Sequence, residues 1–425
     1  MNDYDVIIIG AGIIGLSSAY YLKRNNRDLN ILVIDKNPTY AQGNTSRAAA
    51  GFRDLFSSDP NFKLAHSSIE FYKHVQNELK YNLDMKFVGY LYLLEEKTLK
   101  MYERIFENLS KKTRVEIIDS DRIREIHPDL NFNPDEISSG IIGIDKIEHG
   151  FLGYNCGIFE PDLLSSFYYE KSKELGVKFM FNTDVESLIL EPVNRIDYPG
   201  EPFVWQEKRV GSIKIKNGNI RADYFVIATD VWSSFLLYPI GIDSYAVSKK
   251  RQIFQITGES VKKILFSSGG ISEDKIIPFT VLPKGVYMRP SIKENSLRVS
   301  VSDDIGRNIM LEDDPQPEMN FYAYNIRPVL LAYYPVLENS KIFSSWAGQY
   351  SISTRDDQPY IFKTMNLIYA GVTSGSGVMK GDAIGRMVES LFSGRENAKL
   401  FDGSSIGSDT FGFINRNVPY EEFVL

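Results

Sequence analysis

The sequence predicts an α/β fold with two domains, and three observations support this fold class. The chain is 425 residues long, which exceeds the size at which one hydrophobic core keeps growing. Its first 35 residues carry an apolar run, a glycine-rich turn, a helical stretch and a second apolar run, in that order. Short alternating apolar and polar runs recur between 241 and 339, which predicts an antiparallel sheet and makes the chain α+β overall.

The amino-terminal segment is predicted to form a Rossmann-like βαβ unit. Residues 5–9 are rich in β-branched side chains, which is typical of a strand buried on both faces. Residues 16–24 predict a helix, and the apolar residues 30–34 predict a second strand followed by Asp35. A glycine-rich string between a strand and a helix, with an acid after the second strand, indicates a dinucleotide site.

The residues of this turn suit close contact with a pyrophosphate. Gly10 permits the tight turn, Gly12 lets the backbone approach the phosphates, and Gly15 lets the helix pack against the strand. The free N–H groups at the start of the helix favour an anion. Asp35 is placed to accept hydrogen bonds from a ribose hydroxyl pair, and its charge disfavours the extra phosphate of NADP.

The composition excludes several classes of protein. The net charge is −7, and the 55 acidic and 48 basic residues are spread along the chain, so nucleic acid is not an expected partner. The single cysteine, Cys156, precludes an internal disulfide and favours a reducing compartment. Four histidines and one cysteine stand in no ligand-like spacing, so we expect no metal site.

The longest apolar run, residues 6–22, is interrupted by glycines and serines and follows an acidic leader. It therefore predicts neither a secretory signal nor a membrane-spanning helix. We expect a cytoplasmic protein with at most peripheral membrane contact.

Residues 43–53 distinguish FAD from NAD as the dinucleotide. The segment combines hydroxyls, small residues and two arginines just after the second strand, so it can run close beside a pyrophosphate and a ring system. Thr45, Ser46 and Arg47 are the side chains expected to meet phosphate oxygens.

An ordered series of motifs resembles the D-amino-acid oxidase superfamily of FAD-dependent oxidoreductases, in its branch of glycine oxidases, sarcosine oxidases and related dehydrogenases. The resemblance covers most of the chain. After the fingerprint, the matching segments are residues 43–53, 157–164, 177–186, 222–233, 285–290, 366–371 and 374–380.

The resemblance implies an FAD-binding domain assembled from discontinuous segments and a substrate domain with an antiparallel sheet over the flavin. The expected FAD-binding segments are 1–85, 150–240 and 340–400, and the expected substrate domain comprises 86–149 and 241–339. Residues 401–425 match nothing in the family pattern and form a C-terminal extension.

The resemblance also implies which residues bind FAD. The backbone at Val185 is expected beside the adenine, and the helix after Gly377 is expected to direct its positive end at the flavin's pyrimidine carbonyl. The family usually has glycine where Asp230 stands, which leaves the backbone angle and the added charge there in question. The expected cofactor-binding residues are Gly10, Gly12, Ile14, Gly15, Asp35, Lys36, Thr45, Ser46, Arg47, Ala50, Gly51, Val185, Ala228, Trp232, Gly348, Gly375, Gly377, Met379 and Lys380.

Four residues are candidates for contact with a substrate. Arg53 matches an arginine that sarcosine oxidases carry near the flavin and the substrate. Tyr287 and Arg289 are two residues apart on an expected strand, so their side chains share one face. Lys380 lies close to the lysine of the helix-start motif, although counting from Gly377 places Met379 in that slot. Arginine suits a substrate carboxylate because its fork donates two parallel hydrogen bonds.

Two departures from the family pattern carry expectations of their own. Some sarcosine oxidases attach FAD through a cysteine in the segment aligned with residues 346–350, where this chain has none, so we expect non-covalent FAD. Oxygen-using relatives carry a lysine about where Arg298 stands. We therefore expect an electron acceptor other than, or in addition to, oxygen.

Three functions fit the sequence. The first is oxidation of a small amine or amino acid of the glycine, sarcosine or proline type, by hydride transfer to FAD. The second is a 2-hydroxy acid or glycerol-phosphate dehydrogenase on the same fold. The third is a non-catalytic flavin-bound assembly protein, which the intact arginines disfavour. The sequence is also compatible with a homo-oligomer.

Overall fold

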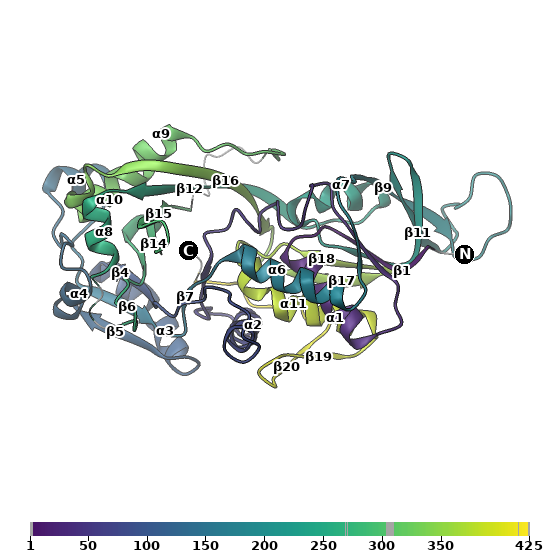
Figure 1. Cartoon of the computed structure of the whole chain (residues 1–425), viewed down its shortest axis with the longest axis horizontal. Helices are drawn as coiled ribbons and strands as arrows, with labels where there is room; N and C mark the ends of the chain where they lie inside the picture. The colour runs from purple at the N-terminus through teal and green to yellow at the C-terminus, as the bar shows by residue number, and fades with distance from the viewer. Residues whose placement is uncertain (1–2, 268, 270, 303–309, 415, 424–425) are drawn as a thin grey trace.

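The computed structural model describes residues 3–267, 269, 271–302, 310–414 and 416–423. Two eight-stranded sheets organise the molecule, and they lie toward opposite ends of its long axis (Figure 1). Within the described ranges, no helix has the length and apolar character needed to cross a membrane.

The first sheet contains the predicted amino-terminal βαβ unit. Its central strands are parallel, β17 and β18 are antiparallel, and β9 and β10 extend from β11 as an antiparallel ribbon. The strand order is β17 (Tyr360–Thr364), β18 (Leu367–Gly371), β11 (Gly218–Ile227), β1 (Tyr4–Ile9), β2 (Ile31–Ile34) and β8 (Lys178–Met180), with β10 (Lys208–Ile215) and β9 (Val185–Pro192) off this path.

Both faces of this sheet are covered, as its apolar strands require. Val6 and Ile8 of β1 belong to a core with the helices, whereas Ile7 and Ile9 point to the other face, toward β9, β10 and α7 (Ser233–Leu237). The helices on the first face and beside it are α1 (Ile13–Asn25), α2 (Asp59–Asn77), α6 (Pro161–Glu174) and α11 (Gly377–Phe392). Figure 1 shows α1, α6 and α11 side by side.

The second sheet is antiparallel except where β4 and β13 run parallel. Its order is β16 (Lys341–Ser353), β12 (Ala246–Thr257), β15 (Ser296–Ser300), β14 (Tyr287–Ser291), β13 (Phe279–Val281), β4 (Tyr90–Leu94), β6 (His149–Gly153) and β5 (Val115–Asp119). Two short pairs complete the strands: β3 (Gly51–Phe52) with β7 (Gly157–Ile158), and β19 (Asn397–Lys399) with β20 (Ser405–Gly407).

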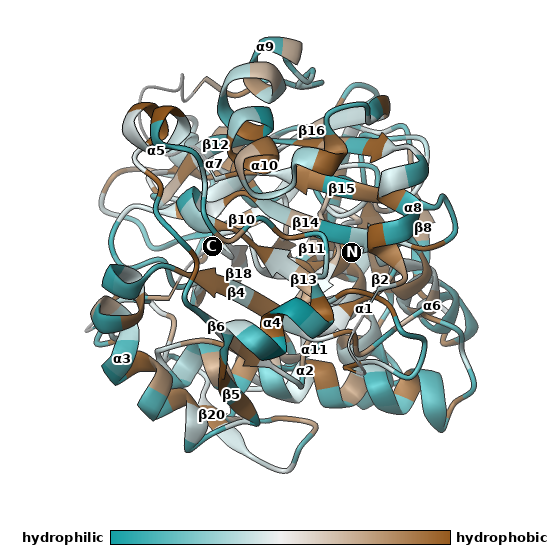
Figure 2. Ribbon diagram, turned by 90° about the vertical axis from the view of Figure 1, so that its left-hand side faces the viewer, coloured by the Kyte–Doolittle hydropathy of each residue, from teal (hydrophilic) through white to brown (hydrophobic). Residues whose placement is uncertain are grey.

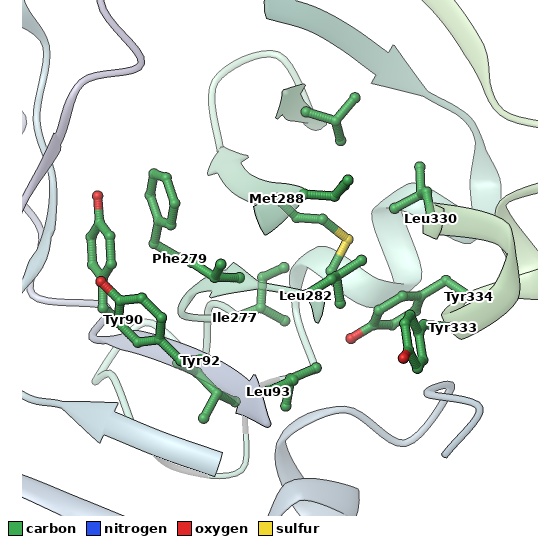
Figure 3. Packing of buried hydrophobic residues seen from close by; sticks show 14 of the residues in the cluster. Tyr90, Tyr92, Leu93, Ile277, Phe279, Leu282, Met288, Leu330, Tyr333 and Tyr334 are labelled. Atoms are coloured by element: carbon green, nitrogen blue, oxygen red, sulfur yellow. The ribbon is translucent and has the colours of Figure 1, made fainter. Parts of the chain in front are cut away.

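Short helices surround this second sheet: α3 (Glu96–Ser110), α4 (Ser120–Ile126), α5 (Glu136–Ile142), α8 (Glu259–Leu265), α9 (Met319–Phe321) and α10 (Arg327–Tyr333). Apolar residues gather on the strands within (Figure 2), whereas the helices carry many polar residues, with Ile137 and Ile141 of α5 as exposed exceptions. One apolar cluster joins the sheet to α10, with Tyr90 and Phe279 at one end and Tyr333 and Tyr334 at the other (Figure 3).

The structure differs from the expected domain division at two strands. β16 and all of β6 after His149 fall within the segments assigned to the FAD-binding domain, yet both strands pair with the second sheet. β16 pairs with β12 along its length, from Lys341 opposite Thr257 to Ser353 opposite Ala246. The boundary near 340 therefore separates a strand from its own sheet, because the motif within residues 346–350 indicates a cofactor contact and says nothing of strand pairing.

A buried carboxylate joins three of the helices that cover the first sheet. Asp382 of α11 accepts hydrogen bonds from the hydroxyls of Tyr21 of α1 and Tyr168 of α6, the latter at 3.0 Å. Arg386, one turn later on α11, donates from Nε at 2.7 Å. Burial raises the pKa of Asp382, and Arg386 and the two hydroxyls act in the opposite direction.

Replacing this carboxylate should destabilise the fold. Asp382→Asn leaves Arg386 without its anion in a buried setting, so the free energy of unfolding should fall by about 3 kcal/mol in urea denaturation. Glu174→Gln removes one partner of the exposed ion pair with Lys171 and should change it by less than about 0.5 kcal/mol. Equal effects of the two substitutions would contradict this role of Asp382.

Candidate functional site

Two adjoining cavities lie between the sheets and the helices. The larger has a volume of about 450 Å³ and the smaller about 120 Å³. Ala48, Tyr350, Gly375 and Val378 line both. A ligand in the larger cavity would therefore be in contact with the wall of the smaller one.

The larger cavity lies at the carboxyl ends of the parallel strands, where open α/β sheets bind ligands. Gly10, Asp35 and Ala228, which follow β1, β2 and β11, are among its lining residues. The Asp35 carboxylate accepts hydrogen bonds from the backbone N–H of Ala11 at 2.7 Å and of Asn37 at 2.8 Å. These bonds fix the carboxylate at the cavity wall.

The turn before α1 leaves room for an anion. Gly10 has a φ of +103°, and a Cβ there would lie 2.5 Å from the Ala228 carbonyl oxygen, whereas a Cβ on Gly15 would overlap the Gly10 carbonyl. Gly12 directly precedes α1 and has no side chain to cap it, and the first turn of the helix carries no acid. Its N–H groups and positive dipole end are thus directed at the cavity.

The segment after β2 forms another wall of the larger cavity. Thr45 Oγ1 accepts a hydrogen bond from the Ile13 N–H at 3.1 Å, which fixes this segment against the start of α1. Lys36 pairs with Asp313 at 2.9 Å and lies 5.3 Å from the Trp232 ring centroid. Arg47 pairs with Asp314 at 2.9 Å.

The structure shows how the chain accommodates Asp230 at the position where the family usually has glycine. Its φ is +49°, a left-handed conformation that aspartate tolerates better than most residues. Its half-buried carboxylate accepts hydrogen bonds from Asn44 Nδ2 at 2.9 Å and from the Ser351 hydroxyl. Burial raises the pKa of Asp230, and these two hydrogen bonds oppose that effect. The glycine-like backbone angle is kept, and the added carboxyl joins two walls of the cavity.

The smaller cavity brings together three of the four expected substrate residues. Arg53 follows β3, Tyr287 begins β14 and Lys380 lies in the first turn of α11. Arg53 and Lys380 are 5% and 1% exposed. Both cations lie over the ring of Phe56, at 4.4 and 4.3 Å from its centroid. Two buried cations beside one small cavity favour an anionic ligand.

Lys380 is poised to change its charge near neutral pH. Its Nζ donates a hydrogen bond to Asn61 Oδ1 at 2.6 Å. The pKa of Lys380 is lowered to about 7, chiefly by burial and also by Arg53, whereas Glu421 acts to raise it. A bound carboxylate would favour the ammonium form.

The start of α11 separates the two cavities. Gly377 lines the larger cavity, Met379 and Lys380 line the smaller one, and Val378 contacts both. Ser376 precedes the helix with no side-chain cap among the described residues, and the first turn has no acid. The positive end of the helix is therefore available to stabilise negative charge on a ligand.

Arg289 does not lie where the sequence predicted. Its guanidinium donates to the Phe159 carbonyl at 3.1 Å and to Glu160 at 3.0 Å. It is not among the residues lining either described cavity, although Tyr287 on the same strand is. A shared strand face was not enough, because the longer side chain of Arg289 reaches the start of α6 and is held there.

The remaining expected cofactor residues divide between lining and supporting positions. Gly15 and Gly348 pack against other parts of the wall, since a Cβ on Gly348 would lie 3.2 Å from Asn44 Oδ1. The Ser46 hydroxyl donates within its own loop, to the Gly43 carbonyl at 3.4 Å. The lining residues of the larger cavity include Gly10, Gly12, Ile14, Asp35, Lys36, Thr45, Arg47, Val185, Ala228, Trp232, Gly375 and Gly377. Those of the smaller include Ala50, Gly51, Met379 and Lys380.

The structure adds residues to the smaller cavity that the sequence did not indicate: Phe56, Asn61, Tyr90, Arg251 and Glu421. They come from loops, helices and strands far apart in the chain, and none lies in a recognisable motif. Glu421 is the least expected, because it belongs to the segment for which the sequence offered no pattern.

The larger cavity fits FAD. Its glycine turn excludes a Cβ, two helix starts without an acid in the first turn face it, and Asp35 follows the end of β2. FAD would place its pyrophosphate at the start of α1.

Comparisons with known proteins agree with this assignment. "FAD-dependent oxidoreductase domain-containing protein 1" of Xenopus laevis is 24% identical over 416 residues, which cover 91% of this chain and 78% of that protein. Glycine oxidase of Bacillus subtilis is 21% identical, covering 92% and 94% of the two chains. The solved L-proline dehydrogenase from P. horikoshii shares the fold, with a TM-score of 0.76 and 21% identity over 97% of each chain.

The family model described as FAD dependent oxidoreductase matches residues 5–391. This span contains both cavity-forming helix starts, the larger cavity and most of the smaller one. The chain belongs to this D-amino-acid-oxidase-type family of FAD-dependent oxidoreductases.

Proposed function

We propose that the protein oxidises a small amino acid of the glycine, sarcosine or proline type, with non-covalently bound FAD as the electron acceptor. The observation that carries this proposal is the small cavity beside the dinucleotide cavity, with Arg53 and Lys380 buried in its wall. Relatives named glycine oxidase and L-proline dehydrogenase support a substrate of this class.

The residues of the smaller cavity divide the work of binding. FAD, when bound, accepts a hydride from the carbon next to the substrate nitrogen. Arg53 and Lys380 would hold the substrate carboxylate, the former with two parallel donors. The rings of Tyr90 and Phe279, stacked at 4.1 Å, give the cavity an apolar wall that excludes water. The volume of about 120 Å³ favours a small substrate.

The two cations would equally suit a 2-hydroxy acid or glycerol phosphate, so substrate class needs a direct test. Purified enzyme is mixed without oxygen with glycine, sarcosine, proline, lactate or glycerol 3-phosphate, and flavin absorbance is followed. We expect bleaching by at least one of the amino acids. Bleaching by lactate or glycerol 3-phosphate alone would overturn the proposal.

We further propose an electron acceptor other than oxygen. Arg298 stands about where oxygen-using relatives carry lysine, and it lies 5.4 Å from the Trp346 ring centroid and 3.8 Å from Glu160. It is not among the residues lining the described cavities. A cation held in this way is not free to stabilise reduced oxygen beside the flavin.

Turnover should therefore be faster with an artificial dye than with oxygen. With the best substrate found, dye reduction should exceed oxygen consumption by at least about tenfold, a barrier difference of about 1.4 kcal/mol. The measurement is steady-state turnover with each acceptor at saturation. Comparable rates would contradict this expectation.

The flavin should be released by denaturation. Residues 346–350 contain no cysteine, and the single cysteine, Cys156, is buried in the core of the second sheet. Acid precipitation should leave yellow FAD in the supernatant, and the apoprotein should take up added FAD. Flavin that stays with the pellet would show a covalent bond.

Arg53 and Lys380 together form the proposed carboxylate clamp. Substitution of either residue should impair substrate use more than FAD binding. Lys380→Met keeps the length of the side chain but loses its charge, and Arg53→Ala removes the guanidinium. Each should lower kcat/KM by an amount equivalent to a loss of about 2–5 kcal/mol of transition-state stabilisation, since the substrate carboxylate loses a charge-assisted hydrogen bond. Arg53→Lys should recover little of the lost kcat/KM.

The KM of the wild-type enzyme should rise above about pH 7 as Lys380 loses its proton, and Lys380→Met should lack that dependence.

Arg289→Ala is the matched control. Because Arg289 pairs with Glu160 in the interior, its loss should lower the free energy of unfolding by about 3 kcal/mol. The KM of the folded fraction should stay near wild type. A selective rise in KM for Arg289→Ala, with Arg53→Ala and Lys380→Met unaffected, would show that Arg289 on β14 binds the substrate carboxylate instead.

A further inference from the structure

The C-terminal segment returns to the interior and closes one side of the smaller cavity. Arg416 binds Asp356 through Nε at 2.6 Å and Nη2 at 2.9 Å. Gln358 Nε2 donates to the Pro419 carbonyl at 2.8 Å, and the Glu421 N–H donates to the Asp356 carbonyl at 3.2 Å. These bonds hold residues 416–421 against the loop that follows β16.

Glu421 is buried at the start of α2. It is 2% exposed. Its Oε1 accepts from the N–H and the hydroxyl of Ser57, both at 2.7 Å, and its Oε2 accepts from the Ser58 hydroxyl at 2.8 Å. Ser58 directly precedes the 19-residue helix α2, so the carboxylate also meets the positive end of that helix.

Asn61 connects Glu421 to Lys380. Asn61 Nδ2 donates to Glu421 Oε2 at 3.1 Å, and Asn61 Oδ1 accepts from Lys380 Nζ at 2.6 Å. The orientation of the amide is fixed by chemistry, because a carboxylate only accepts hydrogen bonds and an ammonium only donates them. All three residues line the smaller cavity.

The same segment reaches the second cation. The Phe423 carbonyl accepts a hydrogen bond from Arg53 Nη2 at 3.5 Å, and the Phe423 ring packs among Tyr92, Phe106 and Phe151. Residues 419–423 therefore contact, directly or through Asn61, both cations of the proposed clamp.

We propose that residues 419–423 belong to the substrate site and that Glu421 is a positioning residue. Through Asn61 it holds the Lys380 ammonium in place to meet the carboxylate of a small amino acid. This inference rests on the proposed function and adds to it a residue that lies outside the family match, which ends at 391.

The charges around the cavity give Glu421 this role. The charged groups on its wall are Arg53, Arg251, Asp357, Lys380 and Glu421, and its phenols are Tyr90, Tyr287 and Tyr350. Of the carboxylates, only Glu421 acts on the pKa of Lys380 among the described residues, raising it against the effects of burial and Arg53.

Glu421 is itself ionised at neutral pH. Burial would raise the pKa of Glu421, but hydrogen bonds from Ser57, Ser58 and Asn61 outweigh burial and lower it. Without this negative charge, the pKa of Lys380 would fall further below about 7. A larger share of Lys380 would then be neutral at pH 7, and the clamp would lose one of its two charges.

The test uses propionate, a carboxylate without an amine, as a probe of the holoenzyme. Its Kd is measured from the change in flavin absorbance between pH 5.5 and 9. In wild type the Kd should rise above about pH 7. In Glu421→Gln the midpoint of this rise should lie about one pH unit lower, and the Kd at pH 7 should be about fivefold higher.

Three further variants separate charge from packing. Glu421→Asp keeps the negative charge and should keep the wild-type midpoint. Asn61→Ala breaks the connection but leaves both charges, so it should weaken propionate binding at all pH values with little movement of the midpoint. Glu422→Gln changes the neighbouring residue, which is 52% exposed and 3.8 Å from Arg104, and should match wild type.

The outcomes test the role of Glu421 separately from the proposed function. A wild-type Kd profile in both Glu421→Gln and Asn61→Ala would overturn the role of Glu421 and leave the proposed function intact. If wild type binds no propionate at any pH, the carboxylate clamp is wrong and this inference falls with it. A lower midpoint in Glu421→Gln, kept at the wild-type value in Glu421→Asp, supports the proposal.

Discussion

The site depends on the close packing of α11 against α1. A Cβ on Gly385 would lie 2.8 Å from the backbone carbon of Ser17, and one on Gly381 would lie 2.9 Å from Ile13 Cγ1. This contact, together with the buried Asp382, fixes where α11 begins. Because the start of α11 forms the wall between the two cavities and carries Lys380, the same helix would position both the cofactor and the proposed substrate.

The sequence predicted the parts of the site that are local in the chain. The turn from Gly10 to Gly15 and the acid Asp35 form one continuous βαβ unit, and the helix start at Gly377 is equally local. Such motifs carry their own backbone geometry, so a single sequence is enough to place them. The antiparallel sheet also followed from short alternating strands.

The rest depends on contacts between distant segments. Arg289 was expected to contact a substrate, but only the folded chain reveals that Glu160 lies within reach of its guanidinium. Residues 340–400 were assigned together to the FAD-binding domain, but β16 pairs with β12 of the second sheet, and such pairing is a property of two strands about 90 residues apart. Glu421 lies some 360 residues from Ser57, Ser58 and Asn61, and no periodicity links them.

The long ladder between β12 and β16 also limits how the enzyme can move. Tyr350, which lines both cavities, lies on β16 opposite Lys249 of β12, while Ser351 of the same strand bonds to Asp230 near the first sheet. Rotating one sheet against the other would strain this continuous backbone connection. The spacing of the two cavities is therefore set by rigid strands, and a change in access to them would have to come from displacement of side chains or loops.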